Sequence, residues 1–134
     1  MSMAEHIPQP LAAAMEQQRQ TLAGLIRKHT RSTPEGEGYH ACAVPGLQLV
    51  RYEHCRPSAS TLAEPALCVF AHGSKEVCLG DERYVYDPLH FLVLSVTMPV
   101  SGRLLNAGPE DPSLLIRLDI DPAEINQLIA DAGP

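Results

Sequence analysis

The chain has 134 residues, a formal net charge of −6 and 45% hydrophobic residues. This length and composition indicate one globular domain with a single hydrophobic core, and they exclude a disordered chain. The net negative charge, with no basic run longer than Arg27-Lys28, argues against nucleic-acid binding by these residues themselves.

The cysteines form no metal or redox motif, because no two of them stand in a CxxC pair. No secretory signal opens the sequence, and the longest apolar run, at about 91–96, is too short to cross a membrane. We therefore expect reduced thiols, a cytoplasmic location and no membrane contact. The four cysteines are Cys42, Cys55, Cys68 and Cys78.

A helix is predicted over residues 8–30. Pro8 and Pro10 suit its first turn, and apolar residues recur at helical spacing to form one stripe. The stripe consists of Leu11, Met15, Leu22, Leu25, Ile26 and His29.

A second helix is predicted over about 122–131. Asp121 is a good N-cap, Pro122 suits the first helical position, and Glu124 completes a capping-box arrangement. Its apolar face consists of Ile125, Leu128 and Ile129.

Between the helices, over about 39–120, the period changes to that of strands. ALCVFAHG (66–73) is typical of a strand buried on both faces, and KEVCL and ERYVY flank a hairpin turn at Gly80-Asp81. A further strand is predicted at HFLVLSV (90–96), stopped by Pro99, and two more at GRLLNAG (102–108) and SLLIRLDI (113–120). The segment HCRPSASTLAEPA (54–66) is predicted to be a polar connection. Five or six short strands without intervening helices predict a mostly β fold, an antiparallel barrel or sandwich with a helix at each end.

No catalytic machinery is visible. There is no GxSxG motif, and His72-Gly73-Ser74 stands alone without a supporting base or acid. The six histidines show neither an HxH nor an HxxxH spacing, and the pairs Glu110/Asp111 and Asp119/Asp121 sit at turns. A small closed barrel without such groups has one obvious use, which is to hold a small ligand.

Most of the chain resembles the N-terminal domain of AraC-type transcription regulators. The resemblance lies in VPGLQLVR (44–51), in EPALCVFAHGSKEVCLGDERYVYDPLHFLVLSVTMPVSG (64–102) and in LLIRLDIDPAEINQLIADAG (114–133), with LAGLIRKHT (22–30) similar to the family's start. Leu89 stands where many members have glycine, so we expect a different turn after Asp87-Pro88.

The resemblance implies a cupin-like barrel that senses a small-molecule effector in a bacterial regulator and that dimerises. In full-length members, two helix-turn-helix motifs follow. We therefore expect residues 1–134 to be a single sensor domain of a truncated chain, a homodimer that reaches DNA only through the missing C-terminal domain.

Comparison with metal-binding cupins implies that no metal or other cofactor is bound. The carboxylate ligand of those proteins would fall at Ala66, the HxH pair near residues 60–62, and the last histidine near Pro99-Val100. None of these positions holds a ligand-forming side chain.

Candidate ligand-binding residues follow from strand parity, since Ala66 pointing inward would make Cys68 and Phe70 point inward too. An arginine on the apolar strand 113–120 needs a partner if it is buried, either an anionic ligand or a carboxylate such as Asp119 or Glu124. Two other functions stay open, a small cupin enzyme and a dimerisation module that binds nothing. The full candidate set is Cys68, Phe70, Tyr86, His90, Ser95 and Arg117.

Overall fold

The computed structural model describes residues 9–30, 37–55, 59–88 and 90–133, so the expectations for Pro8 and Leu89 lie outside the described residues. A helix opens this part of the chain, strands follow, and a second helix ends it. The elements are α1 (Gln9–His29), β1 (Gly38–Ala41), β2 (Leu47–Tyr52), β3 (Ala59–Ala63), β4 (Ala66–His72), β5 (Lys75–Leu79), β6 (Glu82–Tyr86), β7 (Leu92–Leu94), β8 (Met98–Leu104), β9 (Ser113–Asp119) and α2 (Pro122–Ala132).

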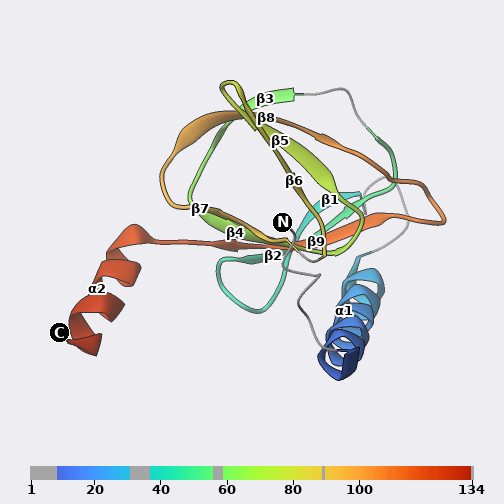
Figure 1. The fold of residues 1–134 in the computed structure, drawn as a ribbon, viewed down its shortest axis with the longest axis horizontal. Coiled ribbons are helices and arrows are strands. Elements are labelled where there is room, and N and C mark those ends of the chain that lie inside the picture. Colours follow the sequence, from blue (N-terminus) through green and yellow to red (C-terminus); the bar gives the residue numbers. More distant parts are fainter. Residues whose placement is uncertain (1–8, 31–36, 56–58, 89, 134) are drawn as a thin grey trace.

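The strands form two antiparallel sheets that face each other (Figure 1). Sheet A has the order β1-β2-β9-β4-β7, and sheet B has the order β3-β8-β5-β6. The expected fold class, mostly β with a helix at each end, is confirmed, and its form is a sandwich of two sheets.

The main core lies between the sheets. The aromatic rings of Phe70 and Tyr86, one from each sheet, pack at a centroid distance of 5.0 Å. Val50, Val77 and Leu115 complete the fully buried part of this core. In β4 and β5, side chains of alternate residues point to this interior, as the pleat of a β-strand requires.

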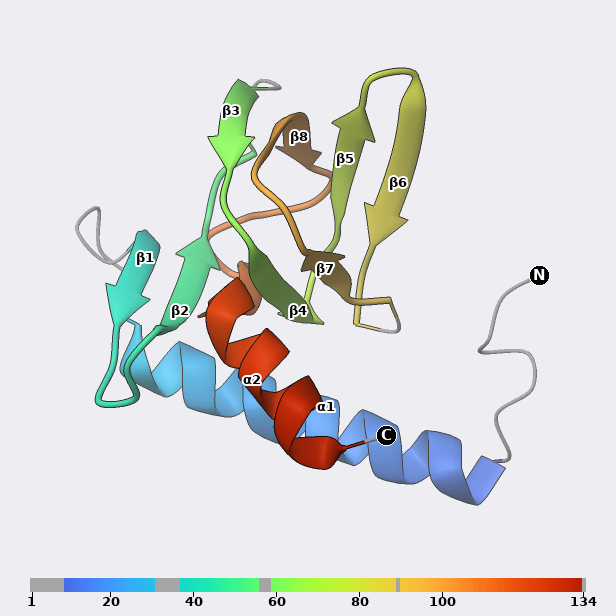
Figure 2. The same cartoon turned by 90° about the vertical axis from the view of Figure 1, so that its left-hand side faces the viewer.

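Helix α1 covers the outer face of sheet A (Figure 2). Its contact is centred on Ile26, which packs with Ala71 of β4 and Leu114 of β9 in a second buried cluster. Arg19 Nη1 donates a hydrogen bond of 2.7 Å to the carbonyl of Ala71, which ties the middle of the helix to β4.

The buried face of α1 differs from the predicted stripe. Leu11, Leu25 and His29 are exposed, whereas Arg19 and Thr30 are turned to the sheet. The reason is that the helix also anchors through polar groups: Arg51 Nη1 of β2 donates to the carbonyl of Thr30 at 2.9 Å. Periodicity of apolar residues alone does not reveal such contacts.

The strands differ from the sequence prediction in three places. The segment taken as a polar connection contains β3, which pairs with β8 along its whole length. Pro99 lies inside β8 instead of ending a strand, and it faces Leu62 in the register. Only Leu92–Leu94 of the predicted strand 90–96 forms β7.

Helix α2 begins as predicted, with Asp121 Oδ1 accepting a hydrogen bond from the backbone N–H of Ala123 at 2.9 Å. The helix then extends away from the body of the sandwich, and none of its residues is buried (Figure 1). No helix within the described ranges is long and apolar enough to cross a membrane.

The two phenylalanines of the chain offer a matched test of this packing, because Phe70 is 1% exposed and Phe91 is 66% exposed. Phe70→Ala leaves a void between the sheets, and we expect it to lower the free energy of unfolding by about 3–5 kcal/mol. Phe91→Ala is expected to change it by no more than about 0.5 kcal/mol. Urea denaturation followed by circular dichroism gives both values, and equal losses for the two variants would contradict the described core.

Candidate functional site

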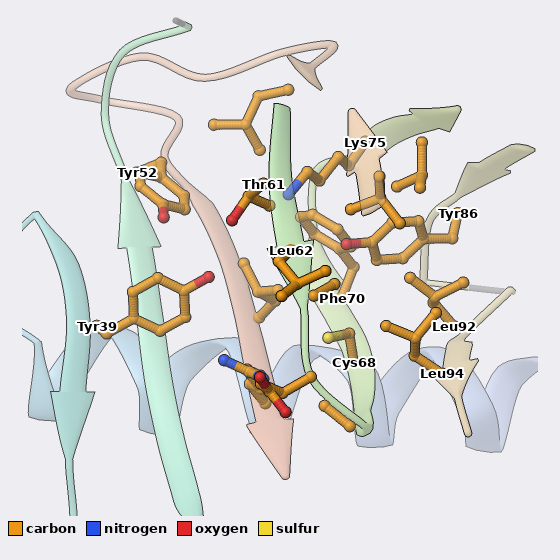
Figure 3. A pocket seen from close by; sticks show the side chains of 18 residues that line it. Tyr39, Tyr52, Thr61, Leu62, Cys68, Phe70, Lys75, Tyr86, Leu92 and Leu94 are labelled. Atoms are coloured by element: carbon orange, nitrogen blue, oxygen red, sulfur yellow. The ribbon is translucent and has the colours of Figure 1, made fainter. Parts of the chain in front are cut away.

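A cavity of about 210 Å³ lies between the two sheets (Figure 3). Each of the nine described strands contributes at least one side chain to its wall. Most of the wall is apolar and comes from Phe70, Val77, Leu92, Leu94, Val100, Leu104 and Leu115. The side chains of the sandwich therefore leave a space between the sheets unfilled, and exposed lining residues such as Leu62 and Tyr39 mark where this space opens to solvent.

Strand β4 supplies the side of the cavity that the sequence predicted. Ala66, Cys68 and Phe70 all line it, as strand parity requires, while Ala71 packs under α1. Burial raises the pKa of the Cys68 thiol, so this cysteine is protonated and unreactive at neutral pH.

Tyr86 faces Cys68 and Phe70 from β6 of the opposite sheet. Its ring is 4% exposed, and burial raises the pKa of its hydroxyl far above the ordinary value. The hydroxyl therefore acts in the cavity only as a neutral hydrogen-bonding group.

Arg117 lines the cavity from β9, where it stands beside Cys68 in the register of the sheet. Its side chain is 25% exposed, and its Nε lies 3.7 Å from Asp119 Oδ1. Asp119, one of the partners that the sequence suggests for Arg117, thus lies at ion-pair distance from it.

His90 and Ser95 are not among the residues that line the cavity. Both are exposed, and His90 Nδ1 lies 2.9 Å from Asp87 Oδ1 in a surface turn. The structure therefore brings together four of the six predicted residues and leaves these two outside the wall.

Sequence reasoning missed five polar residues of the cavity, namely Lys75, Tyr39, Tyr52, Thr61 and Glu64. Lys75 had a usable signal, because it alternates with Val77 in a strand whose other face carries Glu76. Tyr39 and Tyr52 come from the neighbouring strands β1 and β2, and their rings meet edge to face at 6.4 Å. Thr61 lies in β3, which the sequence did not reveal.

The positions that hold metal ligands in cupins carry no ligands here. Ala66, Thr61, Leu62 and Val100 all line the cavity, but none provides an imidazole or carboxylate group. Within the residues that the structure describes, no group of three histidine, cysteine or acidic side chains is close enough to hold a metal ion.

The His72-Gly73-Ser74 segment does not form a nucleophile–base pair. His72 Nε2 lies 2.6 Å from Asp111 Oδ1, whereas the Ser74 hydroxyl donates to Asn106 Oδ1 at 3.4 Å. The histidine and the serine are thus used in separate surface contacts.

Residues 43–134 match the family described as the AraC-type transcriptional regulator N-terminus. No curated protein matches the chain.

Similar solved structures are distant. The chain is 13% identical to Drosophila melanogaster CENP-C bound to CAL1, covering 78% of this chain and 98% of that chain, with a TM-score of 0.46. The Drosophila melanogaster CENP-C cupin domain is 14% identical, over 84% and 98% of the two chains, with a TM-score of 0.43. A cupin-2 domain containing protein from Shewanella frigidimarina is 12% identical, over 62% and 80%, with a TM-score of 0.41.

Thiol labelling tests the enclosure of this cavity. Cys42 and Cys55 are exposed, whereas Cys68 is partly buried and has a raised pKa. We expect iodoacetamide at neutral pH to modify Cys42 and Cys55 first and Cys68 last, because the thiolate is the reacting form. Peptide mass spectrometry over time measures this order, and modification of Cys68 as fast as that of Cys55 would show that the sheets do not enclose it.

Proposed function

Because this chain belongs to the family of AraC-type transcriptional regulator N-terminal domains, we propose that it is the part of a bacterial regulator that binds a small-molecule effector. The observation that carries the proposal is the cavity of about 210 Å³ between the sheets. A fully packed sandwich offers no place for an effector, whereas an apolar cavity of about 150 Å³ is already large enough to bind benzene.

The wall of the cavity has the character of a ligand site. It combines a largely apolar surface with a few polar groups, among them Arg117, Lys75 and Cys68. Small-molecule sites generally have this composition, in which apolar contacts give affinity and isolated polar groups give orientation and specificity.

The same wall favours a binding function over an enzymatic one. Its acidic residue, Glu64, is exposed and accepts a hydrogen bond from the Thr97 hydroxyl at 3.1 Å, so it faces no second carboxylate or histidine across the cavity. We infer that the domain senses and does not transform its ligand. A regulator of this family acts on DNA in the cytoplasm. We assign the DNA contact to residues other than 9–133, because DNA-binding surfaces are basic and this chain has a net charge of −6.

We propose further that a second copy of the chain covers α2. Ile125, Leu128 and Ile129 on this helix are 44%, 64% and 64% exposed. A second apolar surface crosses the outer face of sheet A, where Leu118 stands between its strand neighbours Leu47 and Leu67.

The two surfaces lie close together in the chain, since Leu118 belongs to the strand that leads into α2. In a symmetric dimer, the helix of each copy covers the apolar surface of the other, so both are removed from water at once.

Effector binding is tested by a thermal-shift screen of a metabolite library against the wild type and Ala66→Leu. Ala66 is 4% exposed and faces the cavity, so leucine fills part of the ligand's space. A ligand at a hundred times its Kd is expected to stabilise the wild type by about 2.7 kcal/mol, and Ala66→Leu is expected to lose this gain. Ala13→Leu, on the exposed side of α1, is the control and should respond as the wild type does. A ligand that stabilises Ala66→Leu as strongly as the wild type binds elsewhere and contradicts the proposal.

Dimerisation is tested with Leu128→Glu. A charge at this position opposes burial of the α2 face, so we expect the variant to be monomeric at concentrations at which the wild type is dimeric. Asn126→Glu introduces the same charge at another exposed position of α2 and serves as the control. Multi-angle light scattering gives the mass of each, and a wild type that stays monomeric at high concentration would refute this part.

A further inference from the structure

Lys75 enters the cavity from the first position of β5. Lys75 and Val77 both line the wall, while Glu76 between them faces the outside of sheet B. Glu76 Oε1 lies there 3.3 Å from Arg103 Nε and 3.7 Å from Arg83 Nε. The alternation of the strand thus places the positive charge of Lys75 inside the sandwich. The adjacent carboxylate of Glu76 lies outside, between two arginines.

The ammonium group of Lys75 has no acceptor among the described residues, since neither a hydrogen bond nor an ion pair joins it to any of them. Burial lowers its pKa, and the positive charge of Arg117 lowers it further. Lys75 is half-buried, and a cation in such a position without a counter-ion loses hydration that no group of the wall replaces. The position of this unpaired ammonium group in the cavity wall therefore points to a partner that is not part of the wall.

Gly102 of β8 makes room for this lysine. A Cβ atom at Gly102 would lie 2.8 Å from Lys75 Cε and 3.3 Å from the carbonyl oxygen of Glu76. The backbone of Gly102 is not in the left-handed region, so no turn requires glycine in this strand interior, where glycine normally weakens a strand. Glycine at this position instead lets the lysine side chain pass over β8 and into the cavity.

The carboxylates near the cavity are not placed to neutralise Lys75. Asp119 lies at ion-pair distance from Arg117, and Glu64 accepts its hydrogen bond from the Thr97 hydroxyl. The Lys75 side chain extends across the cavity toward Thr61 (Figure 3). The hydroxyl of Thr61 is a neutral group that can donate a further hydrogen bond to an anion.

We propose that the cavity binds a small organic anion, a monocarboxylate with an apolar body, and that Lys75 is its counter-ion. The inference rests on the effector function proposed above and specifies the chemical class of the effector. Apolar side chains such as Phe70, Leu92 and Leu115 contact the body of the ligand. If about 150 Å³ holds the six carbon atoms of benzene, a cavity of about 210 Å³ holds about eight non-hydrogen atoms.

The probes are therefore hexanoate and benzoate, each paired with its neutral amide, which has nearly the same shape. Isothermal titration calorimetry at neutral pH is expected to show binding of the carboxylates, and binding of the amides weaker by about 10- to 100-fold, the equivalent of one hydrogen bond between charged groups. An amide that binds as tightly as its carboxylate would overturn the proposal.

Three variants assign the effect to Lys75. Lys75→Met keeps the length of the side chain and removes its charge, so we expect it to lose the preference for carboxylates and, without ligand, to melt at a higher temperature than the wild type. Gly102→Ala keeps the lysine but displaces it, and it is expected to weaken carboxylate binding as well. Arg83→Met removes a positive charge from an exposed side chain on the outer face of the same sheet and should bind as the wild type does.

The outcomes separate this inference from the effector function. Unchanged hexanoate and benzoate binding by Lys75→Met would overturn the role of Lys75, and binding of neither carboxylate by the wild type would overturn the anion class. If neutral compounds from the library still bind the wild type and fail to bind Ala66→Leu, the effector function stands without the anion. If no compound of any charge binds, both proposals fail.

Discussion

Strands β4 and β9 are packed against protein on both faces, and this constraint determines the rest of the structure. Leu114 packs under α1, while its neighbour Leu115 faces the space between the sheets. In β4, the side chain of Phe70 faces the space between the sheets, and that of Ala71 packs under α1. A shift of either strand by one residue would exchange the helix-facing and cavity-facing sets, so the register of this pair positions the helix and the cavity wall together.

The cavity is the point at which stability and binding oppose each other. A sandwich of this size is most stable when its interior is filled, because each void forfeits dispersion contacts of the side chains around it. Here the interior keeps an unfilled space and adds Lys75, whose charge is unfavourable there. Features that lower stability and occur together in one place are typical of sites that bind a ligand.

Much of this fold is predictable from the sequence because its periodicities are strong. The double burial of β4, the hairpin at Gly80-Asp81 and the cap at Asp121 follow from local patterns, and parity on β4 places Cys68 in the wall. β3 is not predictable in this way, since its short polar segment becomes a strand only by pairing with β8. His90 is predicted to face the interior only if the strand includes residue 90. The strand begins at Leu92, so the alternation of side chains along a strand does not apply to His90.

The position of Lys75 in the cavity wall could not be predicted from the sequence pattern alone. Its alternation with Val77 was visible, but lysine in a strand usually faces solvent, so only the opposing sheet and the glycine at position 102 reveal where the side chain goes.

The proposed site requires an unfilled interior, and xenon binding tests this most directly, because xenon binds beside apolar side chains without requiring any particular polar contact. Crystals of the domain pressurised with xenon should show xenon density between the sheets, against Phe70, Leu92 and Leu115. An interior without xenon, with these side chains packed against one another, would contradict the existence of the cavity and with it the proposed site.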